Sequence, residues 1–313
     1  MSYSASPVLV TGATGAQGGA TARALLAAGF PVRILTRDPQ SPTAQALLTL
    51  GAEVIQGDMN EPASLVVAAE GAYGLFSVQR PDVDGSDSER RHGYALLEAA
   101  RQCGVRHLVH TSVCEAGRHQ NFPGWENRRW YQKYWTDKWD IEEKARHAGF
   151  LHWTILKPAF MMDNFAQPKA RSMFPHLQQG RIITALRPDT RLQLTCADDV
   201  GAFAAAAFAA PARFDRRNID LGAEALTMTE VAAILSRLLQ KRAVAESVSP
   251  DEAKAAGLNP GWVRTQEWIN EVGYRADLES LKGYGIPLTS FTAWIERHAD
   301  QIVIDTQSTG AAA

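Results

Sequence analysis

The chain has 313 residues, of which 45% are hydrophobic, and its 32 basic and 34 acidic residues give a formal net charge of −2. This length and apolar content predict a globular protein of one or two domains with a substantial core, and they exclude global disorder. The near-neutral charge provides no electrostatic footprint for nucleic-acid binding. The longest uninterrupted apolar run, residues 202–210, is far shorter than the roughly 20 residues of a membrane-spanning helix.

Targeting signals and metal sites are also missing from the sequence. The first residues lack the basic and apolar segments of a signal peptide, so we expect a cytoplasmic protein. Three widely spaced cysteines provide neither a disulfide framework nor a CxxC pair, and histidines do not cluster with them at metal-ligand spacing. We therefore expect a small-molecule substrate as the partner, with no metal, no membrane and no nucleic acid.

Short apolar strands alternate with helical patterns along the first half of the chain. Strands are predicted at 8–11, 32–35, 53–56, 73–78, 106–111 and 152–156. Helices are predicted between them at 20–28, 43–50, 62–69, 88–103 and 126–147, most of them ended by a glycine. This alternation predicts an α/β protein with a Rossmann-like, doubly wound parallel sheet that is covered by helices on both faces.

Beyond residue 157 the alternation becomes irregular. Helices are predicted at 197–209, 228–240, 250–256, 261–272 and 289–299, and the strands between them are too broken up for an independent sheet. We therefore divide the chain into a Rossmann-like core at 1–157 and a smaller C-terminal α/β lobe at 158–305, packed on the core, where a substrate would bind. Residues 306–313 are expected to form a flexible tail.

Three glycines, Gly12, Gly15 and Gly18, directly follow the first strand and open the first helix. In this context the first glycine permits a tight turn, the second lets the backbone approach a pyrophosphate, and the third lets helix and strand pack closely. The helix N-terminus directs partial positive charge towards the phosphates. The alternative interpretation is a glycine-rich turn that binds no ligand.

The end of the second strand decides between NAD and NADP. NAD enzymes place an acidic residue about 20 positions after the glycine loop, at the ribose 2′-hydroxyl. Arg37 lies nineteen residues after Gly18 and can clamp a 2′-phosphate, so NADP is the preferred cofactor and NAD is possible. If the chain turns one residue earlier, the Asp38 carboxylate would instead accept a hydrogen bond from the ribose 2′-hydroxyl, as in NAD enzymes. Asp58, just past the third strand, either meets the adenine edge or forms an Asx turn.

A proton-transfer site is predicted after the fifth strand. Tyr134 and Lys138 lie four residues apart in the predicted 126–147 helix, and Ser112 lies at the end of the fifth strand, where ligands meet a parallel sheet. A lysine ammonium there would hold the nicotinamide ribose and lower the tyrosine pKa. The phenol would then exchange a proton with a substrate oxygen, which the serine hydroxyl orients.

The same predicted helix is dense in aromatic residues. Its side chains form two rows at i, i+4 spacing. The first row is Trp130, Tyr134 and Lys138, and the second is Tyr131, Trp135 and Trp139. Because one row faces the core and the other is free for a pocket, we expect a bulky, flat substrate that is aromatic or quinone-like. The alternative is a tryptophan-rich helix that packs against the smaller lobe, with Tyr134 as a packing residue.

Five motifs give the chain a resemblance to a known family. They are VTGATGAQG at 10–18, LTRDP at 35–39, QGDM at 56–59, DKWDIEE at 137–143 and KPAFMMDNF at 157–165. With these motifs the chain resembles the short-chain dehydrogenase/reductase superfamily, and more closely its atypical NmrA-like branch, from residue 7 to residue 300.

The resemblance implies roles for individual residues. The pyrophosphate would be cradled by Gly12, Thr14, Gly15, Gln17 and Gly18. Arg37 would bind the 2′-phosphate, and Asp58 would bind the adenine. Lys138 occupies the position of the family's lysine and would bind the nicotinamide ribose. Pro158 and Phe160 would line the nicotinamide, and Met59 and Ser77 are also assigned to the cofactor site. The expected substrate pocket comprises Trp130, Asn164 and Phe165.

The resembled branch contains both reductases and redox-sensing regulators that bind NADP without turning it over. A tyrosine at the superfamily spacing favours an NADP-dependent oxidoreductase that moves hydride between NADPH and a carbonyl, enone or quinone. The alternatives are a non-catalytic NADP(H) sensor that acts through a protein partner, and an epimerase or dehydratase that retains its cofactor. The sequence leaves a homodimer open.

Overall fold

The computed structural model describes residues 6–82 and 85–305, so the predicted tail at 306–313 lies outside the described residues. The chain divides into two compact units. The first unit comprises residues up to 117 together with 132–158 and 197–221, and the second comprises 118–131, 159–196 and the chain from 222 onwards.

The first unit is built on a seven-stranded sheet. Its strands are β1 (Val8–Val10), β2 (Val32–Thr36), β3 (Glu53–Gln56), β4 (Gly74–Ser77), β5 (His107–Thr111), β6 (His152–Pro158) and β10 (Arg217–Leu221). They follow the order β10-β6-β5-β4-β1-β2-β3, and each neighbouring pair runs parallel. The central strands β1, β4 and β5 are buried along their whole length, as a parallel sheet covered on both faces requires.

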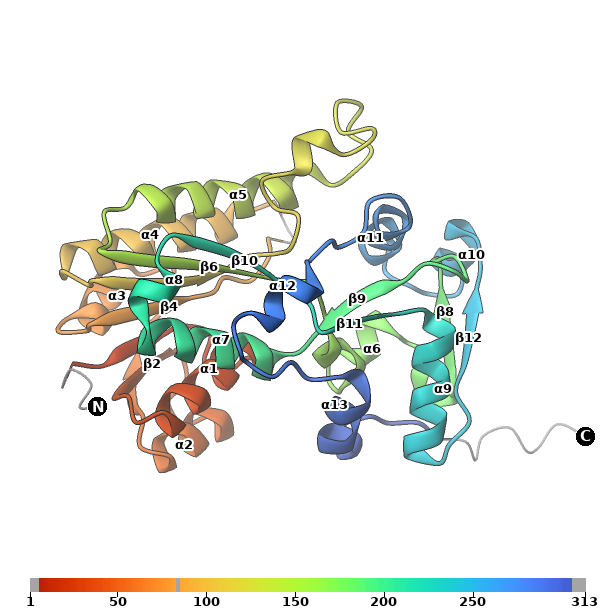
Figure 1. Cartoon of the computed structure of the whole chain (residues 1–313), viewed down its shortest axis with the longest axis horizontal. Helices are drawn as coiled ribbons and strands as arrows, with labels where there is room; N and C mark the ends of the chain where they lie inside the picture. Colours follow the sequence, from red (N-terminus) through yellow and green to blue (C-terminus); the bar gives the residue numbers. More distant parts are fainter. Residues whose placement is uncertain (1–5, 83–84, 306–313) are drawn as a thin grey trace, which may run out of the picture. The chain divides into compact units, whose positions relative to one another are not determined.

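Helices cover both faces of this sheet. They are α1 (Ala16–Ala27), α2 (Pro42–Thr49), α3 (Pro62–Ala69), α4 (Ser88–Gln102), α5 (Gln132–His147), α7 (Ala197–Ala209) and α8 (Pro211–Phe214). Within the first unit, α4 and α5 lie on one face of the sheet, and α1 and α7 lie on the other (Figure 1). The predicted Rossmann-like, doubly wound parallel sheet is therefore confirmed.

Three elements from beyond residue 157, α7, α8 and β10, complete the first unit, whereas the sequence places all of 158–305 in one smaller lobe. Helix α7 packs on α1 so closely that a Cβ at Gly201 would lie 2.7 Å from the backbone carbonyl of Ala20. Strand β10 pairs with β6, with Ile219 opposite Leu156. Both contacts join residues far apart in the chain, so local patterns give no sign of them.

The helix predicted over 126–147 begins only at Gln132. Arg128 adopts a left-handed φ of +54°, and its N–H donates to the Trp125 carbonyl at 3.0 Å in a turn. A left-handed residue interrupts an α-helix. Trp130 and Tyr131 therefore both precede the helix, so the first member of each predicted i, i+4 row is wrong.

The second unit contains two small sheets, where the sequence predicted strands too broken up for one. Strands β7 (Phe160–Met161), β9 (Leu192–Thr195) and β11 (Glu224–Leu226) form the first sheet, and β8 (Arg181–Thr184) and β12 (Val244–Ser247) form the second. Its α-helices are α6 (Ala170–Met173), α9 (Met228–Leu239), α10 (Pro250–Ala255), α11 (Pro260–Glu271), α12 (Leu278–Lys282) and α13 (Phe291–His298). In the part of the chain that the structure describes, no helix combines the length and apolar character needed to cross a bilayer.

Candidate functional site

The glycine loop turns tightly between β1 and α1. Gly12 has a left-handed φ of +62°, and its carbonyl accepts a hydrogen bond from the Gly15 N–H at 2.9 Å. A Cβ at Gly18 would lie 2.4 Å from the backbone of Gly12, so only glycine lets α1 start this close to the strand end. Gly12, Thr14 and Gly15 are exposed, which leaves their backbone open to a ligand.

Two threonines fix this loop to the neighbouring strands. The Thr11 hydroxyl at the end of β1 donates to the Phe76 carbonyl of β4 at 3.1 Å. The Thr111 hydroxyl at the end of β5 donates to Oε1 of Gln17 at 2.6 Å. The side chain of Gln17, predicted to serve the pyrophosphate, is thereby held against the carboxyl end of the sheet.

Acidic side chains beyond β2 and β3 are engaged in local turns. Oδ1 of Asp38 accepts from the Gln40 N–H at 2.9 Å, and Oδ1 of Asp58 accepts from the Asn60 N–H at 2.8 Å. The Asn60 N–H bond lowers the pKa of Asp58 below its ordinary 3.8; partial burial opposes this, and the Asn60 amide and the Arg37 charge reinforce it. Arg37 itself is exposed, and its guanidinium makes no hydrogen bond or ion pair with a described residue.

The two other residues assigned to the cofactor site in this unit are less open. Ser77, at the end of β4, is fully buried. Its hydroxyl lies 3.2 Å from Nδ1 of His110 and accepts from Nε2 of Gln79 at 3.0 Å. Met59 is partly buried and packs against the apolar core. Burial, and then repulsion from the Lys138 ammonium, lowers the pKa of His110 to about 3, so this imidazole is neutral.

The predicted catalytic residues Tyr134 and Lys138 lie one turn apart on α5, and Ser112 directly follows β5. Lys138 is buried. Its Nζ lies 2.7 Å from Oε1 of Glu89 and 5.2 Å from the centroid of the Tyr134 ring. Burial, together with the Glu89 carboxylate, raises the pKa of the Tyr134 phenol above 10, whereas the sequence led us to expect that lysine would lower it. The Ser112 hydroxyl is buried without a hydrogen-bond partner among the described residues.

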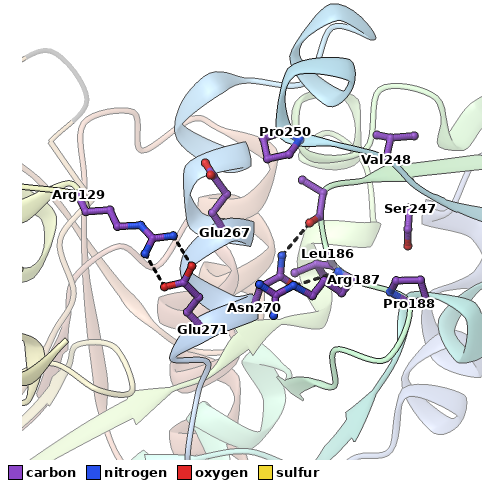
Figure 2. A pocket seen from close by; sticks show the side chains of 11 residues that line it. Arg129, Leu186, Arg187, Pro188, Ser247, Val248, Pro250, Glu267, Asn270 and Glu271 are labelled. Carbon is purple, nitrogen blue, oxygen red and sulfur yellow. Dashed lines mark hydrogen bonds and ion pairs between the residues drawn. The ribbon is translucent and has the colours of Figure 1, made fainter. Parts of the chain in front are cut away.

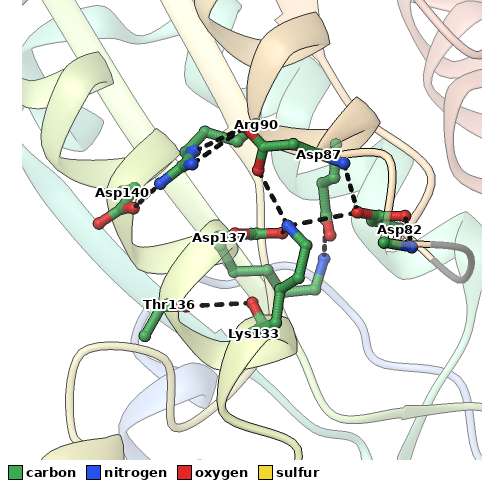
Figure 3. A network of polar contacts seen from close by, with 10 residues as sticks. Asp82, Asp87, Arg90, Lys133, Thr136, Asp137 and Asp140 are labelled. Carbon is green, nitrogen blue, oxygen red and sulfur yellow. Dashed lines mark hydrogen bonds and ion pairs between the residues drawn. The ribbon is translucent and has the colours of Figure 1, made fainter.

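A second set of charges surrounds Lys133, one turn earlier on α5 (Figure 3). Its Nζ lies 3.2, 2.9 and 2.5 Å from carboxylate oxygens of Asp82, Asp87 and Asp137. The Lys133 hydrogen bond, followed by that of Arg90, lowers the pKa of Asp87 below 3.8. These contacts fix the start of α4 against α5. Within residues 6–82 and 85–305, no group of three or more His, Cys, Asp or Glu side chains has the geometry to hold a metal ion.

The remaining predicted residues contribute mainly to packing. Pro158 ends β6 in the first unit, and its carbonyl accepts from the Cys114 N–H at 3.0 Å. In the second unit, Phe160 stacks on Trp262 with centroids 5.1 Å apart, and Phe165 stacks on Phe174 at 4.4 Å. Both Phe160 and Phe165 are buried in this aromatic core.

Two expected pocket residues of the second unit have different environments. Trp130 is buried, and its indole Nε1–H donates to the Pro123 carbonyl at 2.8 Å, which fixes the loop before α5. Asn164, in the short 3-10 helix Met162–Phe165, is half-buried, and its amide makes no hydrogen bond to a described residue. Of the two, Asn164 is therefore the side chain with polar groups available to a ligand.

The second unit carries an open pocket of about 410 Å³ beside α11 (Figure 2). Arg129 and Glu271 line one side and form a two-pronged ion pair, with one N–O distance of 2.7 Å. Asn270 accepts from the Arg187 N–H at 2.9 Å, which fixes the segment after β8. The residues that line this pocket do not include Trp130, Asn164 or Phe165.

Sequence reasoning did not identify Glu89 or Thr111 as site residues. For Glu89 a signal was present, because it precedes Gly93, Leu97 and Ala100 at helical spacing and so lies on the buried stripe of α4. A carboxylate on such a stripe needs a partner. Thr111 has no such signal, since a threonine suits any strand end.

Comparisons with known proteins agree with this geometry. A model of the NmrA-like family matches residues 4–286. A (4-alkanoyl-5-oxo-2,5-dihydrofuran-3-yl)methyl phosphate reductase of Streptomyces griseus is 33% identical over 249 residues, which cover 80% of this chain and 79% of that protein.

Solved structures of low sequence identity share the fold. Triphenylmethane reductase from Citrobacter sp., complexed with NADP(H), has a TM-score of 0.74 at 23% identity and covers 93% of this chain and 99% of its own. NmrA, a negative transcriptional regulator in complex with NADP, has a TM-score of 0.71 at 20% identity, and the match covers 95% of this chain and 98% of the NmrA chain. Because the family model spans most of the sequence and the fold agrees with it, the chain belongs to the NmrA-like family.

Proposed function

We propose that the chain is an NADP(H)-dependent oxidoreductase that reduces a carbonyl, enone or quinone group of a flat, aromatic small molecule. The observation that carries this proposal is the difference between two neighbouring side chains at the end of β2. Asp38 is held in a local turn, whereas Arg37 is exposed and has no side-chain partner among the described residues. A free guanidinium at this position suits a 2′-phosphate, which favours NADP over NAD.

The glycine loop fits a pyrophosphate. Helix α1 begins after Gly15 with no side-chain cap and no acidic residue in its first turn, so its first N–H groups and the positive end of its dipole stay open. Gly12 and Gly15 are exposed and carry no side chain, so they leave room for a pyrophosphate to approach this backbone closely. NADP(H) bound there would supply a hydride to the substrate.

Side chains at the end of β5 and on α5 would handle the substrate oxygen. The Tyr134 phenol is neutral, because its pKa is raised, and can donate its proton to that oxygen. The unpartnered Ser112 hydroxyl can orient the same oxygen through a hydrogen bond. Lys138 contributes positive charge on the ring face of Tyr134.

Two of the similar proteins support small-molecule reduction by their names. The Streptomyces griseus relative is a reductase of an alkanoyl-oxo-dihydrofuran phosphate, and the Citrobacter protein is named for a triphenylmethane, which carries three aromatic rings. An aromatic dye and a quinone are therefore reasonable first substrates in an assay of NADPH oxidation.

The test is a tryptophan-fluorescence titration with NADPH and NADH on the wild type and on Arg37→Asp. We expect NADPH to bind more tightly than NADH, and Arg37→Asp to weaken NADPH by about tenfold or more while NADH changes little. Arg106→Asp is the matched control, since this exposed arginine directly precedes β5, at the amino end of the parallel strands, whereas Arg37 follows β2 at their carboxyl end. Equal losses for both nucleotides in Arg37→Asp would contradict the NADP assignment.

A second candidate function is a regulator that binds NADP(H) without turnover, acting through a protein partner. The Lys138–Glu89 ion pair favours it, because this pair engages the lysine expected at the nicotinamide ribose. The NADP-bound regulator NmrA shares the fold. Tight NADPH binding with no oxidation across a panel of quinones, enones and aromatic dyes would favour the regulator over the enzyme.

A further inference from the structure

A buried ion pair joins α4 to α5 beside Tyr134. Lys138 Nζ donates to Oε1 of Glu89 at 2.7 Å, and the two side chains are only 9% and 2% exposed. Close helix approach explains the contact, because a Cβ at Gly93 would lie 2.8 Å from the Ile141 side chain. Gly93 lies one turn after Glu89 and Ile141 one turn after Lys138, so the same helix faces bring the two charges together.

This pair is a costly way to join two helices. Taking both charges out of water is unfavourable, and apolar residues of similar volume are often at least as stabilising. Glu89 also keeps its second oxygen, Oε2, buried without a hydrogen-bond partner among the described residues. A buried charged pair next to a proposed catalytic group therefore points to a chemical role.

The pair acts on Tyr134, which lies one turn before Lys138. The ammonium sits over the aromatic face, 5.2 Å from the ring centroid, and the phenol makes no hydrogen bond to a described residue. Positive charge on the ring favours ionisation of the phenol, whereas the Glu89 carboxylate opposes it. Burial and Glu89 together raise the pKa of Tyr134.

Other titratable groups lie on the two helices that carry this trio and on β5. Asp87 precedes α4, Lys133 and Asp137 lie on α5, and His110 lies on β5. Lys133 pairs with Asp87 and Asp137, and His110 is neutral at ordinary pH. Glu89 is therefore the carboxylate that acts most directly on the phenol.

We propose, resting on the reductase function above, that Glu89 is a positioning residue: it holds the Lys138 ammonium against the Tyr134 ring and offsets its charge, so that Tyr134 works as a neutral proton donor and not as a preformed phenolate. During reduction of a carbonyl by NADPH, the substrate carbon gains the hydride, and the electron pair of the C=O bond moves to the oxygen. That oxygen takes the Tyr134 proton, and water later returns a proton to the phenolate.

The test is an NMR titration of the full chain labelled at the ζ-carbon of tyrosine, with Tyr134→Phe to identify the Tyr134 signal. In the wild type we expect the midpoint of this signal to lie above the ordinary tyrosine value of about 10. In Glu89→Gln its midpoint falls by about one pH unit or more, because the opposing carboxylate charge is gone. Glu89→Asp keeps the charge and retains the high midpoint.

Glu142→Gln is the matched control. Glu142 is equally buried on α5 and pairs with Arg146 at 2.7 Å, so this variant also removes one buried carboxylate from an ion pair. We expect it to leave the Tyr134 midpoint unchanged. The same contrast should appear in the pH profile of NADPH oxidation, whose alkaline fall moves to lower pH in Glu89→Gln but not in Glu142→Gln.

Two results would overturn the role of Glu89: a wild-type Tyr134 midpoint at or below about 10, or the same midpoint in the wild type and Glu89→Gln. The wild-type measurement needs only Tyr134→Phe for assignment, so a midpoint at or below about 10 would overturn the role even if Glu89→Gln does not fold. Because the titration uses neither nucleotide nor substrate, it also separates the two proposals. Absence of turnover with a high, Glu89-dependent midpoint would refute the reductase function alone.

Discussion

Gly18 provides a direct test of how the nucleotide loop is built. The Cβ of an alanine there would lie 2.4 Å from the carbonyl carbon and oxygen of Gly12 and 2.5 Å from the Thr11 oxygen. Comfortable contacts begin near about 3.5 Å, so these atoms must retreat by roughly 1 Å. They belong to the end of β1 and its tight turn, where no flexible side chain can give way.

The expected cost of Gly18→Ala follows from that geometry. Overpacking of a well-packed core typically costs about 1–3 kcal/mol, and a clash with backbone belongs at the upper end. Since 1 kcal/mol shifts Tm by about 2–4 °C in a domain of this size, Gly18→Ala should melt about 6–12 °C lower than the wild type. The displaced turn should also weaken NADPH binding.

Gly15→Ala is the matched control, because it adds the same methyl group three residues earlier. Its Cβ would meet only the Gly12 carbonyl oxygen, at 3.3 Å, and the φ of −101° at Gly15 suits any residue. We expect stability to change by less than about 1 kcal/mol. The methyl group would lie on the exposed loop where a pyrophosphate approaches, so NADPH binding should still weaken.

Calorimetric melting of the nucleotide-free proteins and fluorescence titration with NADPH distinguish these effects. Similar Tm losses in Gly18→Ala and Gly15→Ala, or a Gly18→Ala protein as stable as the wild type, would refute the packing argument. Unchanged NADPH affinity in Gly15→Ala would refute the assignment of the loop to the pyrophosphate.

Two further predictions concern the strands beside the loop. Thr111→Val removes the hydroxyl that donates to Gln17 at 2.6 Å, so urea unfolding should show a loss of about 1 kcal/mol and NADPH should bind more weakly, whereas Thr111→Ser should retain both. Burial lowers the pKa values of His107 and His110 to about 3 in the folded chain, whereas the same histidines have a pKa of about 6.5 in the unfolded chain. The unfolded chain therefore takes up protons first, and the stability of the fold falls as the pH drops below 6.5. At pH 5 each histidine should remove about 2 kcal/mol, and an equally steep fall in His110→Asn would contradict this origin.

Features that depend on nearby residues could be predicted from the sequence. The glycine loop and the Arg37 position follow from spacing within one βα unit, whereas α1 begins at Ala16, four residues before the predicted 20–28 helix. The helix predicted at 62–69 is observed as Pro62–Ala69, because Pro62 and Gly71 mark its ends locally. The Rossmann-like sheet itself follows from repetition of such units.

Features that depend on distant residues could not be predicted. Glu89 and Lys138 are 49 positions apart, and their contact depends on the close approach of α4 and α5 at Gly93. The start of α5 was missed for a different reason: the 126–131 segment has helical composition, but the left-handed Arg128 interrupts it. Local propensity is a weak guide where tertiary contacts decide the backbone.

Residues 197–221 belong to the first unit but are synthesised after much of the second unit, which has a consequence for folding during translation. When a growing chain has reached Pro158, one edge of β6 still lacks its neighbour, and the face of α1 that receives Gly201 is uncovered. An open parallel edge strand is a template for pairing with other chains. Synthesis must therefore pass through part of the second unit before the nucleotide-binding sheet can close, and the nascent chain is most prone to self-association in that interval. A fragment ending at Pro158 should aggregate for the same reason, even though it contains the whole glycine loop.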